Sequence, residues 1–299
     1  MSAQRTVLIT GAAGFVGRSL ASALDSAGWR VTGLDRVGVS GDDARAFARF
    51  TVCDLLDHAA LAARMDGQEH DAIVHLAGLL PAHGDRDQLF AVNAGGTSAV
   101  VERVARPGCH VVLFSTGLVY GQQKGPFRED MPRMPTDSYA QSKLAAEVIA
   151  TSWGSATSSP VAVLRPSVLY GPGAPRGMLL MSLLDSLRKG QPFAMTHGEQ
   201  LRDFLHIDDV TRAVVSLLEQ RADGTWNLSS GQSMSVRDAA AMGADLAGRP
   251  DLLRPGALPY RDDEVFDYRL DPSKLCATCG WAPRIDLARG LEGIWKAMA

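Results

Sequence analysis

A glycine-rich turn between an apolar run and a helical pattern constrains the fold of this chain more than any other feature. Thr6–Thr10 is a short apolar run typical of a buried strand, and residues 16–27 repeat apolar side chains at helical spacing. Between them lies Gly11-Ala-Ala-Gly14-Phe-Val-Gly17. Glycines so placed allow a tight turn, a close approach of backbone to a pyrophosphate, and close packing of helix on strand. The sequence therefore predicts a dinucleotide-binding unit at its N-terminus.

Strand and helix patterns alternate through the first half of the chain. Strands are expected at 30–35, 50–53, 72–77, 110–115 and 161–165, and helices at 59–65, 88–105 and 138–152. This alternation favours an α/β fold, a Rossmann-type doubly wound parallel sheet with ligands at the carboxyl ends of the strands. Prolines and glycines interrupt the rhythm after Arg165. We expect an NAD(P)-binding Rossmann domain over 1–166, to which 202–228 returns, and a smaller substrate-binding lobe over 167–201 and 229–299.

Composition narrows the possible partners. The 299 residues carry a formal net charge of -3, which argues against a nucleic acid or an anionic membrane surface as partner. No apolar run is long enough to span a bilayer, and the N-terminus lacks a signal-peptide layout, so a cytoplasmic protein is expected. Cys276 and Cys279 form a CxxC, but no second pair of ligands lies nearby, and no metal site is expected.

An acidic residue ends the second predicted strand. Asp35 follows Gly17 by 18 residues along the sequence. A carboxylate at this position of a dinucleotide-binding unit can accept both hydroxyls of the adenosine ribose. A carboxylate there would repel the 2′-phosphate of NADP, whereas the next residue, Arg36, can stack on adenine or tolerate that phosphate. The carboxylate predicts NAD as the cofactor, and Arg36 leaves NADP possible.

Tyr139 and Lys143 are four residues apart in a predicted helix and so project from the same face. A nearby ammonium favours phenolate over phenol and lowers a tyrosine pKa from about 10 toward neutrality. Such a tyrosine can exchange a proton with a carbinol oxygen at neutral pH. Taken alone, this spacing is more often found on a solvated helix face, so the assignment depends on the rest of the chain.

The motifs together resemble those of extended short-chain dehydrogenases/reductases, of the NAD-dependent epimerase/dehydratase type that acts on nucleotide sugars. The resemblance covers essentially the whole chain. It rests on the glycine loop, Asp54-Leu55, His75-Leu-Ala-Gly78, Asn93 before Gly96-Thr97, Phe114–Gly121, Tyr139 with Lys143, Arg165–Pro172, Gln200–Val210, Asp271–Lys274 and Gly280–Pro283.

The resemblance implies a role for individual residues. Tyr139 is the expected acid/base, Lys143 is expected to lower its pKa and hold the nicotinamide ribose, and Thr116 is expected to hydrogen-bond the reacting oxygen. Residues expected to contact the cofactor are Gly11, Ala13, Gly14, Phe15, Val16, Gly17, Asp35, Arg36, Asp54, Leu55, Leu76, Ala77, Gly78, Asn93, Ser115, Tyr139, Lys143 and Pro166. Those expected to contact the substrate are Thr116, Val168, Arg202 and Arg261, the two arginines aligning with diphosphate-binding arginines.

Two departures from the family pattern bear on the reaction. Dehydratases of this family usually carry an acidic pair after the catalytic threonine, because eliminating water needs its own acid and base. Gly117 and Leu118 occupy those positions, so a 4,6-dehydratase is not expected. Val168 stands where an asparagine often contacts the sugar or phosphates, which weakens the usual sugar-nucleotide pose.

The sequence therefore predicts an NAD(P)-dependent nucleotide-sugar epimerase or 4-keto-reductase that works by reversible hydride transfer at a sugar carbon. One alternative is a dehydrogenase of a free sugar acid or small alcohol without a nucleotide. Another is a non-catalytic dinucleotide-binding protein, since a fold does not fix a function. The base and the sugar stay open.

The family resemblance also implies a homodimer. In it, the helices at 88–105 and 138–152 would form a four-helix bundle with their copies. Ala145, Ala146, Val148 and Ile149 offer a small apolar face for such packing. The alternative is that the same face is buried within one subunit.

Overall fold

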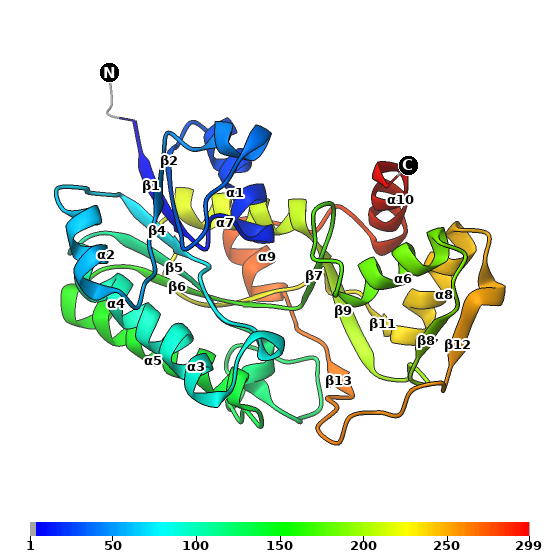
Figure 1. The fold of residues 1–299 in the computed structure, drawn as a ribbon. Helices are drawn as coiled ribbons and strands as arrows, with labels where there is room; N and C mark the ends of the chain where they lie inside the picture. The colour runs from blue at the N-terminus through cyan, green and yellow to red at the C-terminus, as the bar shows by residue number, and fades with distance from the viewer. Residues whose placement is uncertain (1–3, 299) are drawn as a thin grey trace. The chain divides into compact units, whose positions relative to one another are not determined.

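A computed structural model describes residues 4–298 and divides the chain into two compact units. The first unit runs to Val119 and adds Arg133–Arg165 and Thr211–Trp226. The second comprises Tyr120–Pro132, Pro166–Val210 and the chain from Asn227 onward. Each unit has its own sheet and its own core, and Figure 1 labels most of their helices and strands.

A seven-stranded sheet in the order β10-β6-β5-β4-β1-β2-β3 forms the centre of the first unit. Every residue of the β4 and β5 strands is buried, as expected for a sheet covered on both faces. The pairings among the first six strands are all parallel, and the strand order reverses between β1 and β4. Ligands bind at such a switch point, outside the carboxyl ends of the strands. The strands are β1 (Thr6–Thr10), β2 (Arg30–Asp35), β3 (Arg49–Val52), β4 (Ala72–His75), β5 (His110–Phe114), β6 (Val161–Pro166) and β10 (Gly224–Leu228).

Helices cover both faces of this sheet. Helices α1 (Phe15–Ser26) and α7 (Ile207–Glu219) lie on one face, and α2 (His58–Met65), α4 (Gly96–Arg103) and α5 (Ser138–Thr157) lie on the other (Figure 1). One core cluster packs α2 and α4 against β1 and β4, and a second packs α5 against β5 and β6. Fully burying one Leu or Val side chain contributes roughly 1.5–3 kcal/mol, so these clusters fix α5 firmly against the sheet.

The helix predicted at 88–105 is not continuous. It is divided into α3 (Arg86–Phe90), a π-helical turn (Ala91–Gly95) and α4. The π turn carries the buried Asn93, whose amide nitrogen donates to Leu79 O (3.1 Å) and Ser142 Oγ (2.9 Å) and whose Oδ1 accepts the Leu79 N–H (2.7 Å). The extra residue in the turn directs this amide to a neighbouring loop and to α5. Turns of this kind occur often at functional sites.

The second unit combines a four-stranded sheet, a two-stranded ladder and four helices. Strand β9 is central to the sheet, pairing with β7, β11 and β13. Helices α6 and α8 share an apolar core with β8 and with Leu252. The elements are β7 (Val168–Tyr170), β8 (Phe193–Met195), β9 (Leu201–His206), β11 (Ser233–Ser235), β12 (Leu253–Pro255), β13 (Asp267–Tyr268), α6 (Leu179–Arg188), α8 (Val236–Leu246), α9 (Ser273–Cys279) and α10 (Leu287–Ala297).

The unit boundaries differ from the expected domains in two places. Residues 224–226 of β10 and most of α7 lie in the first unit, but residues 202–210 lie in the second because β9 pairs within the second unit's sheet. Residues 120–132 also belong to the second unit, where the Phe127 N–H donates to Arg269 O at 2.7 Å. Arg202 and Arg261 therefore both lie in the second unit.

Two expected absences can be examined over residues 4–298. No helix in that range is long and apolar enough to cross a membrane. No group of three or more His, Cys, Asp or Glu side chains in the same range is arranged to hold a metal ion. Cys276 and Cys279 are free thiols, the second of them buried at the end of α9.

Candidate active site

The first unit contains a groove of about 360 Å³. It begins at the glycine turn after β1 and continues along the ends of β2, β3 and β4. The residues that line it include many of those expected to contact the cofactor: Gly11, Ala13, Gly14, Asp35, Arg36, Asp54, Leu55, Leu76, Ala77 and Gly78. Leu34, Val37, Cys53, Leu56, Leu79 and Val92 line it as well and were not singled out from the sequence.

The glycine turn fits a dinucleotide. Gly11 has φ +70°, and a Cβ there would lie 2.7 Å from the backbone nitrogen of Ala77, at the exit of β4. A Cβ at Gly17 would lie 2.7 Å from the Ala12 Cα atom. No side chain caps the N-terminus of α1, so its first N–H groups and the helix dipole are available to a phosphate.

Asp35 both fixes this turn and faces the groove. Its Oδ2 accepts the backbone N–H of Ala13 at 3.0 Å, and its Oδ1 accepts that of Val37 at 3.3 Å. A carboxylate has about four lone-pair positions, so acceptor capacity remains for ribose hydroxyls. The residues of the groove therefore fit the adenosine half of NAD.

Several residues expected to contact the cofactor lie outside the lining of this groove. Phe15, Val16 and Gly17 form the first turn of α1. Asn93 is buried in the π turn, and Ser115 is buried after β5. Pro166 ends β6 and belongs to the second unit. Their contacts with the cofactor stay predictions.

Helix α5 carries the Tyr/Lys pair. The side chain of Asp137 caps this helix by accepting the Ala140 N–H at 2.8 Å, and Tyr139 lies in its first turn, half-buried. Lys143 follows one turn later with only 5% of its surface exposed. A methyl group at Gly78 would lie 3.6 Å from Lys143 Nζ and 3.0 Å from Asn93 Oδ1. The ammonium group therefore lies beside the wall of the groove.

Burial governs the protonation of Lys143. Removal from water disfavours the charged ammonium and lowers the pKa of Lys143 to about 8, and the negative charge of Glu147 opposes this effect. Lys143 is thus still mostly protonated at neutral pH. A protonated ammonium on this face of α5 is what the acid/base role expected for Tyr139 requires.

A buried histidine joins the strands beneath the groove. The Thr97 hydroxyl donates to Asn93 O at 2.6 Å, so its oxygen accepts the Nε2–H of His75 at 3.1 Å. Nδ1 of His75 then accepts the hydroxyl of Thr10 at 2.6 Å. Burial lowers the pKa of His75 to about 3, and Lys143 adds to this effect, so the imidazole is neutral. It connects β1, β4 and α4 without adding charge near Lys143.

Thr116 lies in the bend after β5 and is buried. Its Oγ1 accepts the Leu118 N–H at 3.2 Å, which leaves the hydroxyl hydrogen for a second partner. The next residues, Gly117–Tyr120, form a 3₁₀ turn. Gly117 and Leu118 bring no ionisable group to this position.

The sequence reading missed a buried ion pair next to Lys143. Arg165 Nε lies 3.0 Å from Glu147 Oε1 and its Nη2 lies 2.7 Å from Oε2, with both side chains at most 3% exposed. The Ser115 hydroxyl donates to the same Oε1 at 2.5 Å. The available signal was the spacing, because Glu147 follows Lys143 by four residues on a face of α5 that also carries the buried Ala140 and Ala146.

Arg202, expected to hold a diphosphate, is engaged within the second unit. Its guanidinium donates to Leu201 O (2.9 Å) and Val265 O (2.6 Å) and forms an ion pair with Glu264. Burial lowers the pKa of Arg202, and Glu264 opposes that shift. Arg261 is exposed, and Val168 is half-buried in β7.

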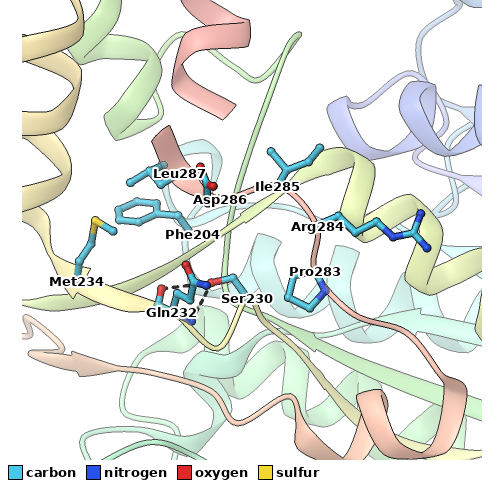
Figure 2. Close-up of a pocket in the computed structure, with 9 residues that line it drawn as sticks. All are labelled: Phe204, Ser230, Gln232, Met234, Pro283, Arg284, Ile285, Asp286 and Leu287. Atoms are coloured by element: carbon cyan, nitrogen blue, oxygen red, sulfur yellow. Dashed lines mark hydrogen bonds between the residues drawn. The ribbon is translucent and has the colours of Figure 1, made fainter. Parts of the chain in front are cut away.

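The second unit also contains a cavity of about 150 Å³, with its lining side chains drawn in Figure 2. Phe204 and Met234 come from β9 and β11, Ser230 and Gln232 from the loop before β11, and Pro283–Leu287 from the segment that leads into α10. The backbone of Gln232 and the hydroxyl of Ser230 are hydrogen-bonded to each other. None of the residues expected to contact the substrate lines this cavity.

Comparison with known proteins identifies the family. Residues 7–229 match the model of the NAD dependent epimerase/dehydratase family. The dTDP-L-rhamnose 4-epimerase of Burkholderia thailandensis is 29% identical, with 96% of this chain and 93% of that protein covered. The dTDP-glucose 4,6-dehydratase of Streptomyces niveus is 30% identical, with 95% and 90% covered.

Solved structures agree with this identification. UDP-glucuronic acid 4-epimerase from Bacillus cereus, in complex with UDP-glucuronic acid and NAD, has a TM-score of 0.87 at 25% identity, over 98% of this chain and 100% of that one. MoeE5 in complex with UDP-glucuronic acid and NAD has a TM-score of 0.87 at 28% identity, over 98% and 99%. The resemblance seen in the motifs and the Rossmann-type fold are thereby confirmed. The chain belongs to the NAD dependent epimerase/dehydratase family and is an NAD-dependent enzyme of the extended short-chain dehydrogenase/reductase type.

Proposed function

We propose that this enzyme is an epimerase or 4-keto-reductase of a nucleoside-diphosphate sugar, with Tyr139 as its acid/base. The observation that carries the proposal is the placement of Lys143. Its buried ammonium lies one helical turn after Tyr139 and against Gly78 in the wall of the dinucleotide groove. A tyrosine with this neighbour can exchange a proton with a sugar hydroxyl while hydride transfer occurs at the same carbon.

Each of the residues assigned to the active site has a distinct part in this mechanism. NAD, when bound, accepts a hydride from a sugar carbon or returns one to it. The charge of Lys143 stabilises the phenolate form of Tyr139, which takes the hydroxyl proton and so becomes the neutral phenol. Thr116 donates its remaining hydroxyl hydrogen to the reacting oxygen and orients it. The glycine turn and Asp35 orient the dinucleotide relative to these groups.

Dehydration does not suit this site. Eliminating water requires an acid for the leaving hydroxyl and a base for the departing proton, in addition to Tyr139. The residues after Thr116 are Gly117 and Leu118, which can do neither. The 4-epimerases among the relatives support epimerisation as the leading reaction, and a 4-keto-reductase needs the same three catalytic residues.

A nucleotide sugar is the substrate that the relatives support. Two related solved structures, both of MoeE5, contain UDP-glucuronic acid and UDP-glucose. In this proposal Arg202 and Arg261 bind the diphosphate, since a guanidinium fork matches phosphate oxygens. Arg202 would have to exchange Glu264 for the diphosphate.

The Arg202–Glu264 pair also gives weight to a second function. An arginine already neutralised by a carboxylate is a poorer anion site, which favours a dehydrogenase of a free sugar acid or small alcohol without a nucleotide. Replacing Arg202 distinguishes the two, because only a diphosphate-binding arginine should change the KM for a nucleotide sugar.

We also propose a cytoplasmic homodimer that forms through α4 and α5, which lie side by side in the first unit (Figure 1). Val148 on α5 is 53% exposed and is available for such an interface. Ala146 is fully buried against β5 and β6, and Ile149 packs on the same core, so part of the expected apolar face is used within the subunit.

The test begins with the purified protein. Denaturing it and identifying the released nucleotides by mass shows whether NAD is retained. An epimerase should retain NAD and convert a nucleotide sugar to its epimer with no net change in NADH. A reductase should consume one added NAD(P)H for each sugar reduced. The proposal would be wrong if a panel of UDP-, dTDP- and GDP-sugars, including 4-keto sugars, gave neither result.

A further inference from the structure

Helix α5 places three polar side chains at successive turns of one face. Tyr139, Lys143 and Glu147 are spaced four residues apart, so each lies about one turn above the last. Their exposure falls along the helix, from the half-buried Tyr139 to Lys143 at 5% and Glu147 at 2%. A carboxylate buried this deeply is rare unless it is paired. Its partners are therefore the next point to establish.

The position of the Glu147 carboxylate is fixed by residues on or directly after two strands of the sheet. Ser115, after β5, donates to Oε1, and Arg165, on β6, donates to both carboxylate oxygens at 3.0 and 2.7 Å. Arg133 lies 4.0 Å from Oε2, but its side chain is 49% exposed. A two-point guanidinium contact and a hydroxyl hold the carboxylate in one orientation and allow it little rotation.

Other groups face Lys143 from neighbouring elements, and they bring no negative charge. His75, from β4, is neutral and donates its Nε2–H to Thr97. Asn93, from the π turn, is an uncharged amide. Glu147 is thus the resident negative charge that acts on Lys143.

We propose that Glu147 is a positioning residue for catalysis: held by Ser115 and Arg165, its carboxylate stabilises the ammonium of Lys143 and so sets the upper pH limit of Tyr139 chemistry. The catalytic part of this inference rests on the proposed function, whereas the effect of Glu147 on Lys143 does not. Without Glu147, burial alone would act on Lys143, and the charge of Arg165 would be left uncompensated nearby.

The chain is well suited to a direct test because it has only five lysines: Lys124, Lys143, Lys189, Lys274 and Lys296. Carbon-13-labelled lysine gives few side-chain signals, and Lys143→Met assigns the signal of interest by its loss. In the wild-type protein the Lys143 signal should titrate near pH 8, well below that of an ordinary lysine. In Glu147→Gln the midpoint should fall by roughly one pH unit or more, the size of effect expected from removing a nearby opposite charge.

Arg133→Gln is the matched control. This variant removes the charge of Arg133, which is exposed and lies near the Glu147 carboxylate. Because ion pairs with an exposed partner are weak, the titration midpoint of Lys143 should stay unchanged within roughly 0.3 pH unit. Glu147→Asp keeps the charge and should retain most of the wild-type value. An unchanged midpoint in Glu147→Gln, with the fold intact by circular dichroism, overturns the proposal.

A buried cation without its partner can unfold a protein, so a second variant carries the same test. Glu147→Gln with Arg165→Gln removes both charges and leaves two amides that can bond to each other. Its Lys143 midpoint should also lie below that of the wild type. A wild-type midpoint in this double variant contradicts the proposal even if the single variant does not fold.

Kinetics then separates this inference from the proposed function. The alkaline limit of kcat/KM should move down in Glu147→Gln by the same amount as the lysine midpoint. The titration uses neither substrate nor cofactor, so it stands if no nucleotide sugar is turned over. A shifted midpoint with an unmoved pH limit would leave the charge effect intact and remove the catalytic role.

Discussion

The Oδ2 atom of Asp35 accepts the backbone N–H of Ala13 at 3.0 Å, so the end of β2 fastens the glycine turn that follows β1. The same carboxylate lines the groove beside Arg36. One side chain therefore shapes the glycine turn, and in the proposed site it would also present acceptors to the adenosine ribose. Removing its charge should disturb both functions together.

We predict that Asp35→Asn weakens NAD binding by about tenfold and narrows the preference for NAD over NADP, since the amide no longer repels a 2′-phosphate. Isothermal titration of nucleotide-free protein with each cofactor measures both effects. Asp42→Asn is the control, because Asp42 is 89% exposed and pairs only with the exposed Arg45. An unchanged ratio of the two affinities in Asp35→Asn contradicts the assignment.

Tyr139→Phe should lower kcat by about 10²–10⁴-fold, the range typical of general acid–base groups. Affinity for NAD should change little, because the variant removes one hydroxyl from a half-buried side chain and keeps the ring. Steady-state kinetics with the substrate identified by turnover, together with NAD titration, tests both parts. Turnover at the wild-type rate would show that the acid/base lies elsewhere.

The free energy of unfolding should increase as the pH rises above about 8, because the buried Lys143 then loses its charge. Its pKa is about 8 in the folded protein against an ordinary value of 10.5, so between these values the unfolded chain binds more protons than the folded one. Stability therefore rises across that interval and, below it, the cost of burying the charge is fully present. Urea unfolding at pH 7 and pH 10 measures this difference.

Replacing the same lysine should separate stability from activity. Lys143→Met keeps an apolar stem in place of a buried cation and should raise the unfolding free energy at pH 7 by ~1–3 kcal/mol while turnover is lost. The gain should disappear at pH 10, where the wild-type lysine is mostly neutral. A variant less stable than the wild type at pH 7 would mean that the ammonium contributes more to the fold than its burial costs.

Glu264 should compete with the substrate for Arg202. In Glu264→Gln the guanidinium loses its ion pair but keeps the carbonyls of Leu201 and Val265, so KM for a nucleotide sugar should fall severalfold. Arg202→Ala should raise the same KM by about tenfold or more. If neither variant changes KM, Arg202 serves only the fold of the second unit, and a substrate without a diphosphate becomes the better account.

The exposed Val148 should lie in a subunit interface. Val148→Arg places a charge on the outward face of α5 and should convert a dimer to a monomer in sedimentation at micromolar concentration. Val52→Arg is the control, since Val52 is 46% exposed on the edge strand β3, away from α4 and α5. A wild-type protein that sediments as a monomer removes the dimer from the account.

Local sequence signals predicted the parts of the site that local geometry determines. The glycine turn, Asp35 and the Tyr139 helix each follow from spacing within one strand, turn or helix, and the structure places them at one groove or on its adjoining helix. The π turn at Ala91–Gly95 could not be seen, because it depends on the buried contacts of Asn93 with Leu79 and Ser142.

Long-range ion pairs were the other features that the sequence did not disclose. Glu147 on α5 pairs with Arg165 on β6, and Arg202 pairs with Glu264, which is 62 residues away. In each case the two partners come from different elements that only the tertiary fold brings together, and neither segment alone identifies its partner. The family resemblance predicts a diphosphate-binding role for Arg202, whereas its carboxylate partner Glu264 is seen only in the folded chain.

The central claim is that Tyr139 and Lys143 act with NAD at a sugar carbon of a nucleotide sugar. Single-turnover reaction of the NAD-loaded enzyme with sugar nucleotides deuterated at C4 tests it most directly. The account predicts that deuterium appears transiently on the cofactor in the wild-type enzyme and that none is transferred in Tyr139→Phe. Deuterium transfer at the wild-type rate in Tyr139→Phe, or transfer only from free sugars or small alcohols, would contradict it.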